Sequence, residues 1–330
     1  MSSRQRVARV VGQNLGLLAA LLSAATFATS GPFAKAMQAA GWSSGATVLL
    51  RVGGASLVLL PSTVWTLRGR WHLVRANVRS IAAYGAVAVA GCQVAYFYAL
   101  QRLDVGIALL MEYTGILLIV AVVAIRRRAL PPRLTSAGIV VSLAGLVLVL
   151  DITGQSRPDP IGLFWGFLAA IGLATYFLVA SEESALPPIA LAGLGMGFGA
   201  VVLAVLGLAR VLPMTFASAD ITLGGLRMPW WFGIGELALV AAAAAYVLGI
   251  AAARRLGSTV ASFVGLTEVL FAIGFAWLLL GELPGPIQLV GGAILLGGVV
   301  AVKLGEAREG PGPAGLEPVA EPEPELLAAR

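Results

Sequence analysis

The sequence predicts an all-α integral membrane protein with ten transmembrane helices, arranged as two inverted five-helix repeats. Three observations support this fold class: the composition, a series of long apolar stretches, and an internal repeat. Hydrophobic residues make up 59% of the 330 residues and charged residues 12%, whereas a soluble domain has roughly 45–50% apolar and about 25% charged residues. Most of the chain is therefore expected to lie in a bilayer.

Apolar stretches long enough to cross a membrane recur along the chain. A helix needs about 20 mainly apolar residues to cross a hydrocarbon core of roughly 30 Å. The first stretch follows a basic start, as in a signal peptide, but it continues to about Met37 without a distinct cleavage site, so we interpret it as a first span. Segments with charge, proline or glycine separate the stretches. The ten predicted spans are residues 13–36, 45–66, 81–100, 105–125, 134–151, 160–180, 188–210, 230–252, 259–280 and 286–304.

The second half of the chain repeats the first. Moving the segment Arg102–Leu150 forward by 153 positions aligns it without a gap on the segment that begins at Arg255. A weaker match places residues 15–29 on residues 161–175. Because each unit has an odd number of spans, the second unit must enter the membrane from the opposite side, which gives inverted repeats. The most informative identities are Thr114 with Thr267, Pro131 with Pro284, Gly138 with Gly291, and Gly145 with Gly298.

The distribution of lysine and arginine predicts the orientation. With the N-terminus in the cytoplasm, 16 of the 22 basic residues fall on the cytoplasmic side and four on the outer side, which obeys the positive-inside rule. The repeated hairpin changes its bias between the halves, since "RRRALPPR" is basic and "LLGELPGP" has no basic residue. Arginine-rich and alanine-rich usage favours a bacterial source. We therefore expect a multi-pass inner-membrane protein with both termini in the cytoplasm.

The domain organisation follows from these spans. Residues 1–12 are predicted to form a cytoplasmic N-terminal tail, residues 13–152 the first five-helix repeat, and residues 158–305 the second. Beyond Gly305 the chain is rich in proline and glutamate and has few large apolar residues. Residues 306–330 are therefore expected to be a disordered cytoplasmic tail.

Five ionisable residues lie within the predicted spans: Lys35, Arg51, Glu112, Glu236 and Glu268. A charge near a helix centre costs at least about 2.5–3.5 kcal/mol on insertion scales, so such residues usually face a cavity and mark function. Small residues share a helical face with three of them, which indicates that these faces point into the bundle rather than to lipid. The small neighbours are Ala108 and Gly115 for Glu112, Ala261, Gly265 and Ala272 for Glu268, and Thr47, Gly54 and Ala55 for Arg51.

We predict that the charges within the spans, together with polar and aromatic residues, form a substrate-binding or translocation pathway. Arg51 and Glu112 have an alternative role, as a structural ion pair that locks two spans together. Lys35 lies near the outer end of its span, where a lysine can reach water, and Glu282 lies at a span end as a cap or loop contact. The candidate pathway residues are Arg51, Glu112, Glu268, Glu236, Gln93, Tyr96, Tyr113 and Tyr176, with Tyr246 as a further candidate.

The residue inventory argues against several classes of protein. The single cysteine, Cys92, can form no internal disulfide, and with the single histidine, His72, it supplies neither a zinc site nor a Ser/Cys-His catalytic group. We therefore predict no metal, no cofactor and no enzymatic activity. The net charge of +6 lies between apolar runs rather than along one soluble face, so no nucleic-acid partner is expected.

The pattern resembles the drug/metabolite transporter superfamily, specifically its EamA-type members, over roughly residues 10–305. The last two spans are similar to that family's closing hairpin, with "GE" before the turn and "GGAILLGG" after it. "LLRVGGASLVLL" is similar to the family's arginine-bearing second span, in which Arg51 is the matching residue. "VGIALLMEYTGILL" resembles the fourth span of the threonine/homoserine exporter branch, although Ile116 stands where that branch tends to have proline.

The resemblance implies an inner-membrane exporter of amino acids or similar metabolites, which works by alternating access and usually uses the proton gradient. The residues suit a zwitterion, with Arg51 for its carboxylate, Glu112 or Glu268 for its ammonium group, and tyrosines for its side chain. The alternatives are efflux of drugs or lipophilic cations and, from other classes, a membrane-embedded enzyme or a scaffold. The expected partners are a small-molecule substrate and the lipid bilayer, and a homodimer is left open.

Overall fold

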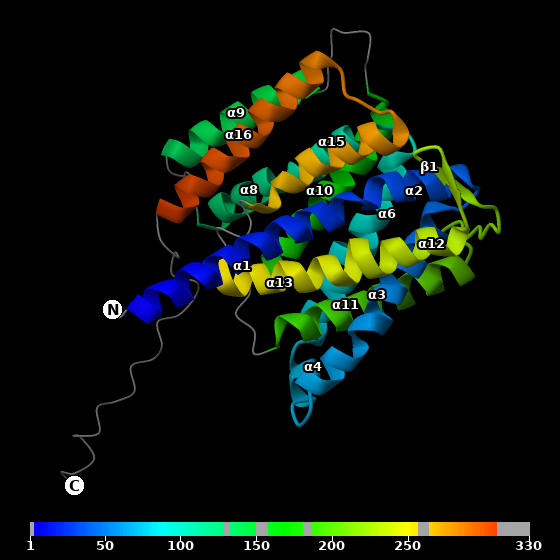
Figure 1. Cartoon of the computed structure of the whole chain (residues 1–330), viewed down its shortest axis with the longest axis horizontal. Helices are drawn as coiled ribbons and strands as arrows, with labels where there is room; N and C mark the ends of the chain where they lie inside the picture. The colour runs from blue at the N-terminus through cyan, green and yellow to red at the C-terminus, as the bar shows by residue number, and fades with distance from the viewer. Residues whose placement is uncertain (1–2, 128–132, 150–157, 181–185, 257–263, 309–330) are drawn as a thin grey trace.

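The computed structural model describes residues 3–127, 133–149, 158–180, 186–256 and 264–308. In these ranges the chain forms a bundle of helices, with one small hairpin at the end shown on the right in Figure 1. The predicted tail lies outside the described residues from position 309 onward. The helices up to residue 149 are α1 (Ser3–Ala28), α2 (Ser30–Ala39), α3 (Ser44–Thr66), α4 (His72–Ala76), α5 (Val78–Ala83), η1 (Tyr84–Gly91), α6 (Cys92–Leu100), α7 (Val105–Tyr113), α8 (Gly115–Arg127) and α9 (Arg133–Val149).

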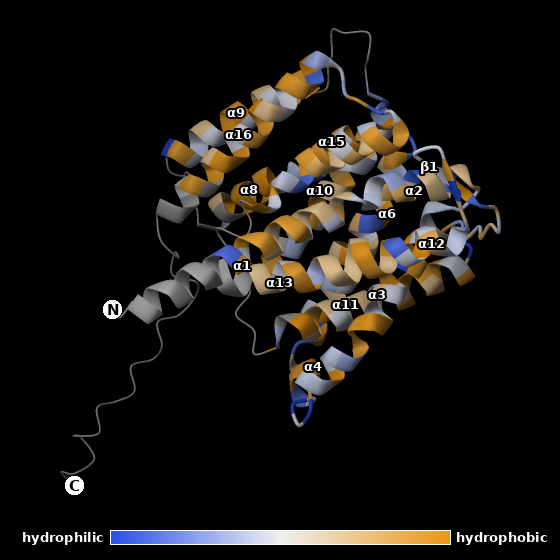
Figure 2. Ribbon diagram, in the orientation of Figure 1, coloured by the Kyte–Doolittle hydropathy of each residue, from blue (hydrophilic) through white to orange (hydrophobic). Residues whose placement is uncertain are grey.

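The elements after residue 149 are also mainly apolar helices, and the outside of the bundle is hydrophobic. Large apolar side chains lie exposed on the outside of the bundle, for example Leu57 at 70% and Leu270 at 62%, and Figure 2 shows hydrophobic colouring along most helices. Such a surface suits contact with lipid rather than with water. These elements are α10 (Pro160–Ala180), α11 (Pro188–Leu208), β1 (Ile221–Leu223), β2 (Leu226–Met228), α12 (Trp230–Gly235), η2 (Glu236–Ala244), α13 (Ala245–Leu256), α15 (Thr267–Leu280) and α16 (Pro286–Arg308).

Each predicted span coincides with an apolar helix, but not all of these helices have spanning length. Within the described residues, six segments are long and apolar enough to cross a membrane, and four further apolar helices are shorter. The count of ten spans therefore remains a prediction. The six are Asn14–Ala39, Ser44–Thr66, Val78–Leu100, Val105–Val122, Ile189–Leu208 and Trp230–Gly249, and the shorter ones are Arg133–Val149, Pro160–Tyr176, Thr267–Leu280 and Pro286–Val302.

Among the described residues, three spans that the sequence predicts as continuous helices are interrupted. The predicted span 259–280 breaks at Leu266, directly before α15. The first span breaks at Thr29, between α1 and α2. Pro32 explains this break, because proline has no N–H for the carbonyl of Ala28 and its ring crowds that carbonyl. The fourth breaks at Thr114, between α7 and α8, where the Thr114 hydroxyl donates to the Met111 carbonyl at 2.6 Å. Breaks of this kind free backbone groups inside the bundle.

Two π-helical segments, η1 and η2, lie within otherwise α-helical rods. The segment η1 joins α5 to α6, and η2 joins α12 to α13. Their last residues, Gly91 and Ala244, are 153 positions apart, which is the offset of the sequence repeat. π-Helical turns are rare and occur frequently at functional sites. The residues packed around η1 and η2 are therefore candidates for a functional site.

A β-hairpin in the loop before α12 departs from the all-α prediction. Strand β1 pairs with β2 in antiparallel fashion, with Ile221 opposite Met228. The connecting residues Gly224 and Gly225 have φ values of 59° and 76°, and a two-residue turn with both φ positive is the favoured hairpin connection. The Gly224 N–H also donates to the Leu279 carbonyl at 2.9 Å. This bond fixes the hairpin to the end of α15.

Helices α9 and α16 lie side by side (Figure 1). They contact each other through glycine residues. A Cβ atom added at Gly138 would lie 2.7 Å from the Gly298 oxygen, and one added at Gly145 would lie 2.7 Å from the Gly291 oxygen. Such separations allow no side chain, so the two backbones touch directly, as small residues permit in membrane helices. The order of these contacts along the chain makes the two helices antiparallel.

Helices from the two halves of the chain interleave around the centre. Helix α3 packs on α11 and η2, α1 packs on α13, and α10 packs on α6 and α7. The small faces predicted around Arg51 and Glu112 lie in these contacts: Thr47, Ala55 and Ala108 are fully buried. On the predicted Glu268 face, a Cβ atom at Gly265 would have no neighbour within 4 Å. A Cβ atom at Gly54 would lie 2.8 Å from the Cβ of Ala238 in η2. Ala261, on the predicted Glu268 face, lies outside the described residues.

Candidate functional site

Four of the in-span charged residues lie on helices that meet inside the bundle. Arg51 is in α3 and Glu236 is the first residue of η2. Glu112 lies two residues before the break at Thr114, and Glu268 lies two residues after Leu266, the N-cap of α15. Interrupted helices bring free backbone groups and charged side chains together at the binding sites of many transporters. Glu112, Glu236 and Glu268 therefore lie at irregular points of the backbone, whereas Arg51 lies within the regular helix α3.

Arg51 is held by neutral groups on three sides. It is 3% exposed. One terminal nitrogen, Nη1, donates to Ser30 Oγ at 2.6 Å and to Gln93 Oε1 at 2.7 Å, and Nη2 donates to the Ala241 carbonyl in η2 at 3.0 Å. The guanidinium carbon lies 5.7 Å from the centre of the Phe97 ring, which adds a cation–π contact.

The direct ion pair between Arg51 and Glu112 is not formed. The described residues form three ion pairs, and none of them includes Arg51. Its Nε atom is buried and has no acceptor in the described part of the chain. A buried charge without a charged partner is costly. The positive charge of Arg51 is thus fixed in position. Glu236 and Glu112 act on it electrostatically without forming an ion pair, which leaves it able to bind an anion directly.

Glu112 has one weak donor. Its Oε1 lies 3.4 Å from Cys92 Sγ at the start of α6. The same thiol lies 3.4 Å from the Ala169 carbonyl in α10, and a thiol has one proton, so only one of these bonds forms at a time. Cys92 is the only donor to Glu112 in the part of the chain that the structure describes. The carboxyl group is therefore available to a stronger donor.

Tyr113 connects the carboxylate-bearing helices of the two halves. Its hydroxyl lies 3.1 Å from Glu268 Oε2 and 3.4 Å from the Gly265 carbonyl. Tyr113 directly follows Glu112 in α7. The contact between Tyr113 and Glu268 therefore links the backbone next to Glu112 to the carboxylate of Glu268. The structure thus brings Tyr113 and Glu268 into contact, and both were predicted pathway residues.

Glu236 meets the break between α1 and α2. Thr29 Oγ1 donates to Glu236 Oε1, and the same hydroxyl lies 2.7 Å from the Thr26 carbonyl. The second carboxyl oxygen, Oε2, is buried and has no partner among the described residues. A buried polar atom without a partner costs free energy. Glu236 therefore retains an unused acceptor position inside the bundle.

The remaining predicted residues divide between two places. Gln93 contacts Arg51 directly, and the Tyr96 ring lies 6.0 Å from the Phe97 ring that faces Arg51. Tyr176 instead packs on Tyr84, with ring centroids 5.6 Å apart. Tyr246 packs edge-on against Phe27, with ring centroids 5.1 Å apart. These tyrosines form an aromatic group in the same bundle, and Tyr246 within it also interacts electrostatically with Arg51.

The sequence interpretation missed several contact residues. Thr29 and Ser30 carry a usable signal, because the glycine–proline pair that follows them marks a break. Cys92 was noted only as a free cysteine. The Phe97 ring and the Ala241 carbonyl have no sequence signal of their own, since their roles arise from packing and from the π-helical backbone.

In the described part of the chain, three ion pairs lie at the end of the bundle near β1, and one of them, Arg227 with Asp220, belongs to the hairpin region itself. Lys35 of α2 does not simply reach water, because its Nζ lies 2.5 Å from Glu282 Oε1. Glu282 Oε2 also accepts from the Val105 N–H, the first residue of α7, at 3.3 Å. These contacts tie together α2, α7 and the turn after α15.

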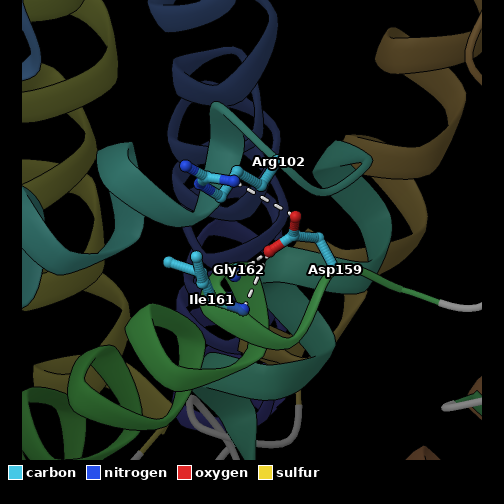
Figure 3. Close-up of polar contacts among 4 residues, drawn as sticks. All are labelled: Arg102, Asp159, Ile161 and Gly162. Carbon is cyan, nitrogen blue, oxygen red and sulfur yellow. Dashed lines mark hydrogen bonds and ion pairs between the residues drawn. The ribbon is translucent and has the colours of Figure 1, made fainter.

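The second pair, Arg102 with Asp159, is more exposed (Figure 3). Asp159 caps α10: its Oδ1 accepts from the N–H groups of Ile161 at 2.8 Å and Gly162 at 3.0 Å, and its Oδ2 lies 3.1 Å from Arg102 Nη1. The Gly162 N–H, with smaller contributions from Ile161 and Arg102, holds the pKa of Asp159 below its usual value.

Comparison with known proteins gives a family match and a fold match. The model of the EamA-like transporter family matches the chain twice, at residues 14–151 and 160–304. A solved chain described as "Crystal structure of protein" is 18% identical, with a TM-score of 0.54 over 91% of this chain and 99% of that chain. At this identity the likeness concerns the fold alone. No curated protein matches the chain.

Proposed function

Because the chain belongs to the EamA-like transporter family and is thus a multi-pass membrane transporter, we propose that it exports a small metabolite, such as an amino acid. The proposal places it in the bacterial inner membrane with both termini in the cytoplasm, as the bias of its basic residues predicts. Within the family, the sequence of the fourth span favours the threonine/homoserine exporter branch. The homodimer remains an open prediction.

The observation that carries the proposal is the setting of Arg51. It is a buried guanidinium with three neutral hydrogen-bond acceptors, Ser30, Gln93 and Ala241, and with no ion pair among the described residues. An arginine fork is well suited to a carboxylate. A solute carboxylate that reached Arg51 would supply the direct ion pair that Glu236 and Glu112 do not form with it.

The carboxylates supply the complementary end of the site. Glu112 and Glu268 are candidates for the ammonium group of the solute, or for a proton that moves with it. Glu112 has only a weak thiol donor, whereas Glu268 contacts the Tyr113 hydroxyl. Protonation of a carboxyl group inside a bilayer removes a charge, which makes such groups common proton carriers in transporters. A proton-coupled exchange of this kind needs no nucleotide-binding domain.

Alternating access is supported by the symmetry of the contacts. Inverted repeats transport by rocking one unit against the other around a central site. Two related units would produce the paired glycine contacts between α9 and α16. They would also place the ends of η1 and η2 153 positions apart, which is the offset of the sequence repeat. Two units, at residues 13–152 and 158–305, are thus the proposed moving parts.

Efflux of lipophilic cations is the alternative substrate class. The carboxylates and tyrosines would serve a cation, but the buried charge of Arg51 would repel it. A zwitterion or an anion is therefore favoured.

The test is solute flux in liposomes that contain the purified full chain. Amino acids and lipophilic cations are loaded, and their efflux is measured with and without a pH gradient, with empty liposomes as the control. We expect efflux of one or more amino acids that increases when a proton gradient is applied. Absence of flux for the whole panel, with protein that keeps its thermal unfolding transition, would overturn the proposal.

A further inference from the structure

An open pocket of about 500 Å³ lies at the end of the bundle that carries β1. Small-molecule sites typically have volumes of roughly 300–1,000 Å³. By the predicted orientation, this end faces the outside of the cell. The polar and aromatic residues that line the pocket are Lys35, Gln38, Trp42, Gln101, Thr222 and Glu282. None of the four central charged residues lines it, so its charged groups, Lys35 and Glu282, are not those of the site around Arg51.

The pocket contains opposite charges in contact. Lys35 and Glu282 lie 2.5 Å apart, with side-chain exposures of 17% and 23%. The pair joins α2 to the turn after α15, and therefore one half of the chain to the other. A ligand with a single charge that displaced one partner would leave the other partner half-buried and unpaired, which is unfavourable. A ligand with both charges can satisfy both partners at once.

Two glutamines leave acceptors on the pocket wall. Gln38 Nε2 donates to the Phe97 carbonyl at 2.8 Å and to Ser44 Oγ at 3.1 Å, and Gln101 Nε2 donates to Ser44 Oγ at 2.9 Å. Because the Phe97 carbonyl can only accept, it fixes the orientation of the Gln38 amide. Among the described residues no donor reaches the Oε1 atom of either glutamine. These oxygens are suitable acceptors for the N–H groups of an ammonium ion.

We propose that this pocket is a second binding site, in which a zwitterionic amino acid places its carboxylate against Lys35 and its ammonium group against Glu282 and the glutamine oxygens. One ion pair is replaced by two, so the charges of the protein remain paired. Glu282 keeps its bond to the Val105 N–H, which holds the carboxylate in place. The choice of an amino acid rests on the proposed function, and the pocket would hold the solute at the outer face before release.

Equilibrium binding to the detergent-solubilised full chain tests the proposal without measuring flux. The probes are glycine, L-threonine and L-leucine, with the methyl ester and the N-acetyl form of each as analogues that carry one charge. Binding is measured in the Arg51→Lys/Glu112→Gln background, in which the central site is impaired and the thermal unfolding transition is used to verify that the protein is folded. We expect saturable binding of at least one amino acid, and affinities about tenfold lower for both analogues, a difference of about 1.4 kcal/mol.

The decisive variant is Lys35→Met/Glu282→Gln in that same background. It removes both charges together and so leaves no unpaired charge. We expect at least about a tenfold loss of affinity for the amino acid that binds. Arg102→Met is the matched control, because it breaks the exposed ion pair at the same end of the bundle without touching the pocket. If the double variant does not fold, Gln101→Leu, which removes one acceptor, is expected to weaken binding by about threefold.

Three results would overturn the proposal. They are no binding of any amino acid probe, unchanged affinity in a folded pocket variant, or a methyl ester that binds as tightly as its parent. The outcome is distinguishable from failure of the proposed function. If the protein binds amino acids but shows no flux, the transport proposal fails and the pocket proposal stands. If it shows flux but the pocket variants bind as tightly as before, the pocket proposal fails and the transport proposal stands.

Discussion

Ser142 of α9 and Leu295 of α16 lie opposite each other where the two helices pack, and the Ser142 hydroxyl donates to the Leu295 carbonyl at 3.3 Å. The two residues are 153 positions apart. On either side of them, Gly138 meets Gly298 and Gly145 meets Gly291. Replacing each residue by its equivalent 153 positions away converts the Gly138–Gly298 contact into the Gly291–Gly145 contact, as expected of two-fold related elements centred at Ser142 and Leu295. Because the two backbones are in contact, adding a single methyl group between α9 and α16 should measurably change the stability of the protein.

Adjacent glycines of α16 provide a matched pair for this packing. A Cβ atom at Gly298 would lie 2.6 Å from the Gly138 oxygen, whereas one at Gly297 would have no neighbour within 4 Å. We expect Gly298→Ala to destabilise the protein by about 1–3 kcal/mol through overpacking. Gly297→Ala should leave stability unchanged or raise it by about 0.5–1 kcal/mol, since alanine is the better helix former. Thermal unfolding of both variants in the same detergent checks this, and equal transitions would contradict it.

Arg51→Lys should reduce transport by about tenfold or more. Lysine keeps the positive charge, but its single ammonium group cannot reproduce the planar fork that contacts Ser30, Gln93 and Ala241. Freed buried acceptors cost about 1–3 kcal/mol each, so the thermal unfolding temperature should fall as well. Flux measured with equal amounts of folded protein separates the two effects. A variant that transports as well as the wild-type chain would remove Arg51 from the proposed site.

Glu112→Gln should abolish the acceleration of export by a proton gradient and leave the fold intact. Glutamine has nearly the same shape but cannot exchange a proton, and the thiol of Cys92 is a weak donor whose loss has little structural effect. Flux with and without a pH gradient is the measurement. Cys92→Ala serves as the control, since it removes the donor and keeps the carboxyl group. Normal gradient-driven export by Glu112→Gln would assign proton coupling to another group, with Glu268 as the next candidate.

Asp159→Ala should destabilise the protein near neutral pH and have less effect in acid. The folded-state pKa of Asp159 lies below its ordinary value of 3.8, because the Gly162 and Ile161 N–H groups and Arg102 favour the ionised form. Its contribution is therefore complete above that value and is lost as the pH falls through the lower, folded-state pKa. Unfolding temperatures of the wild type and variant should converge as the pH falls below about 4. Asp159→Asn, which retains a capping acceptor, should have a smaller effect at neutral pH.

Local sequence patterns predicted the apolar helices and the small-residue faces well. Span positions follow from twenty-residue apolar runs, and Thr47, Ala55 and Ala108 are buried because helical periodicity places them beside Arg51 and Glu112. The family match agrees with the predicted EamA-type resemblance. The span count, the exporter branch and the roles of the pathway residues stay predictions.

Contacts that depend on three-dimensional packing could not be read from the chain. Lys35 was expected to reach water, but it meets Glu282, which is 247 positions away. The hairpin before α12 has three-residue strands, which are too short to produce a strong alternating pattern. The Ala241 carbonyl contacts Arg51 because η2 is π-helical, and an alanine-rich run carries no sign of that.

The paired π-helical segments also bear on the history of the chain. A helical turn closed by an i→i+5 bond contains one residue more than an α-helical turn, so such segments are what single-residue insertions produce. The segments η1 and η2 end at Gly91 and Ala244, at equivalent positions of the two halves. One insertion in an ancestral unit of the kind that the family model matches twice, followed by duplication, would account for both segments. The irregular backbone around Arg51 would then be older than the two-unit protein that contains it.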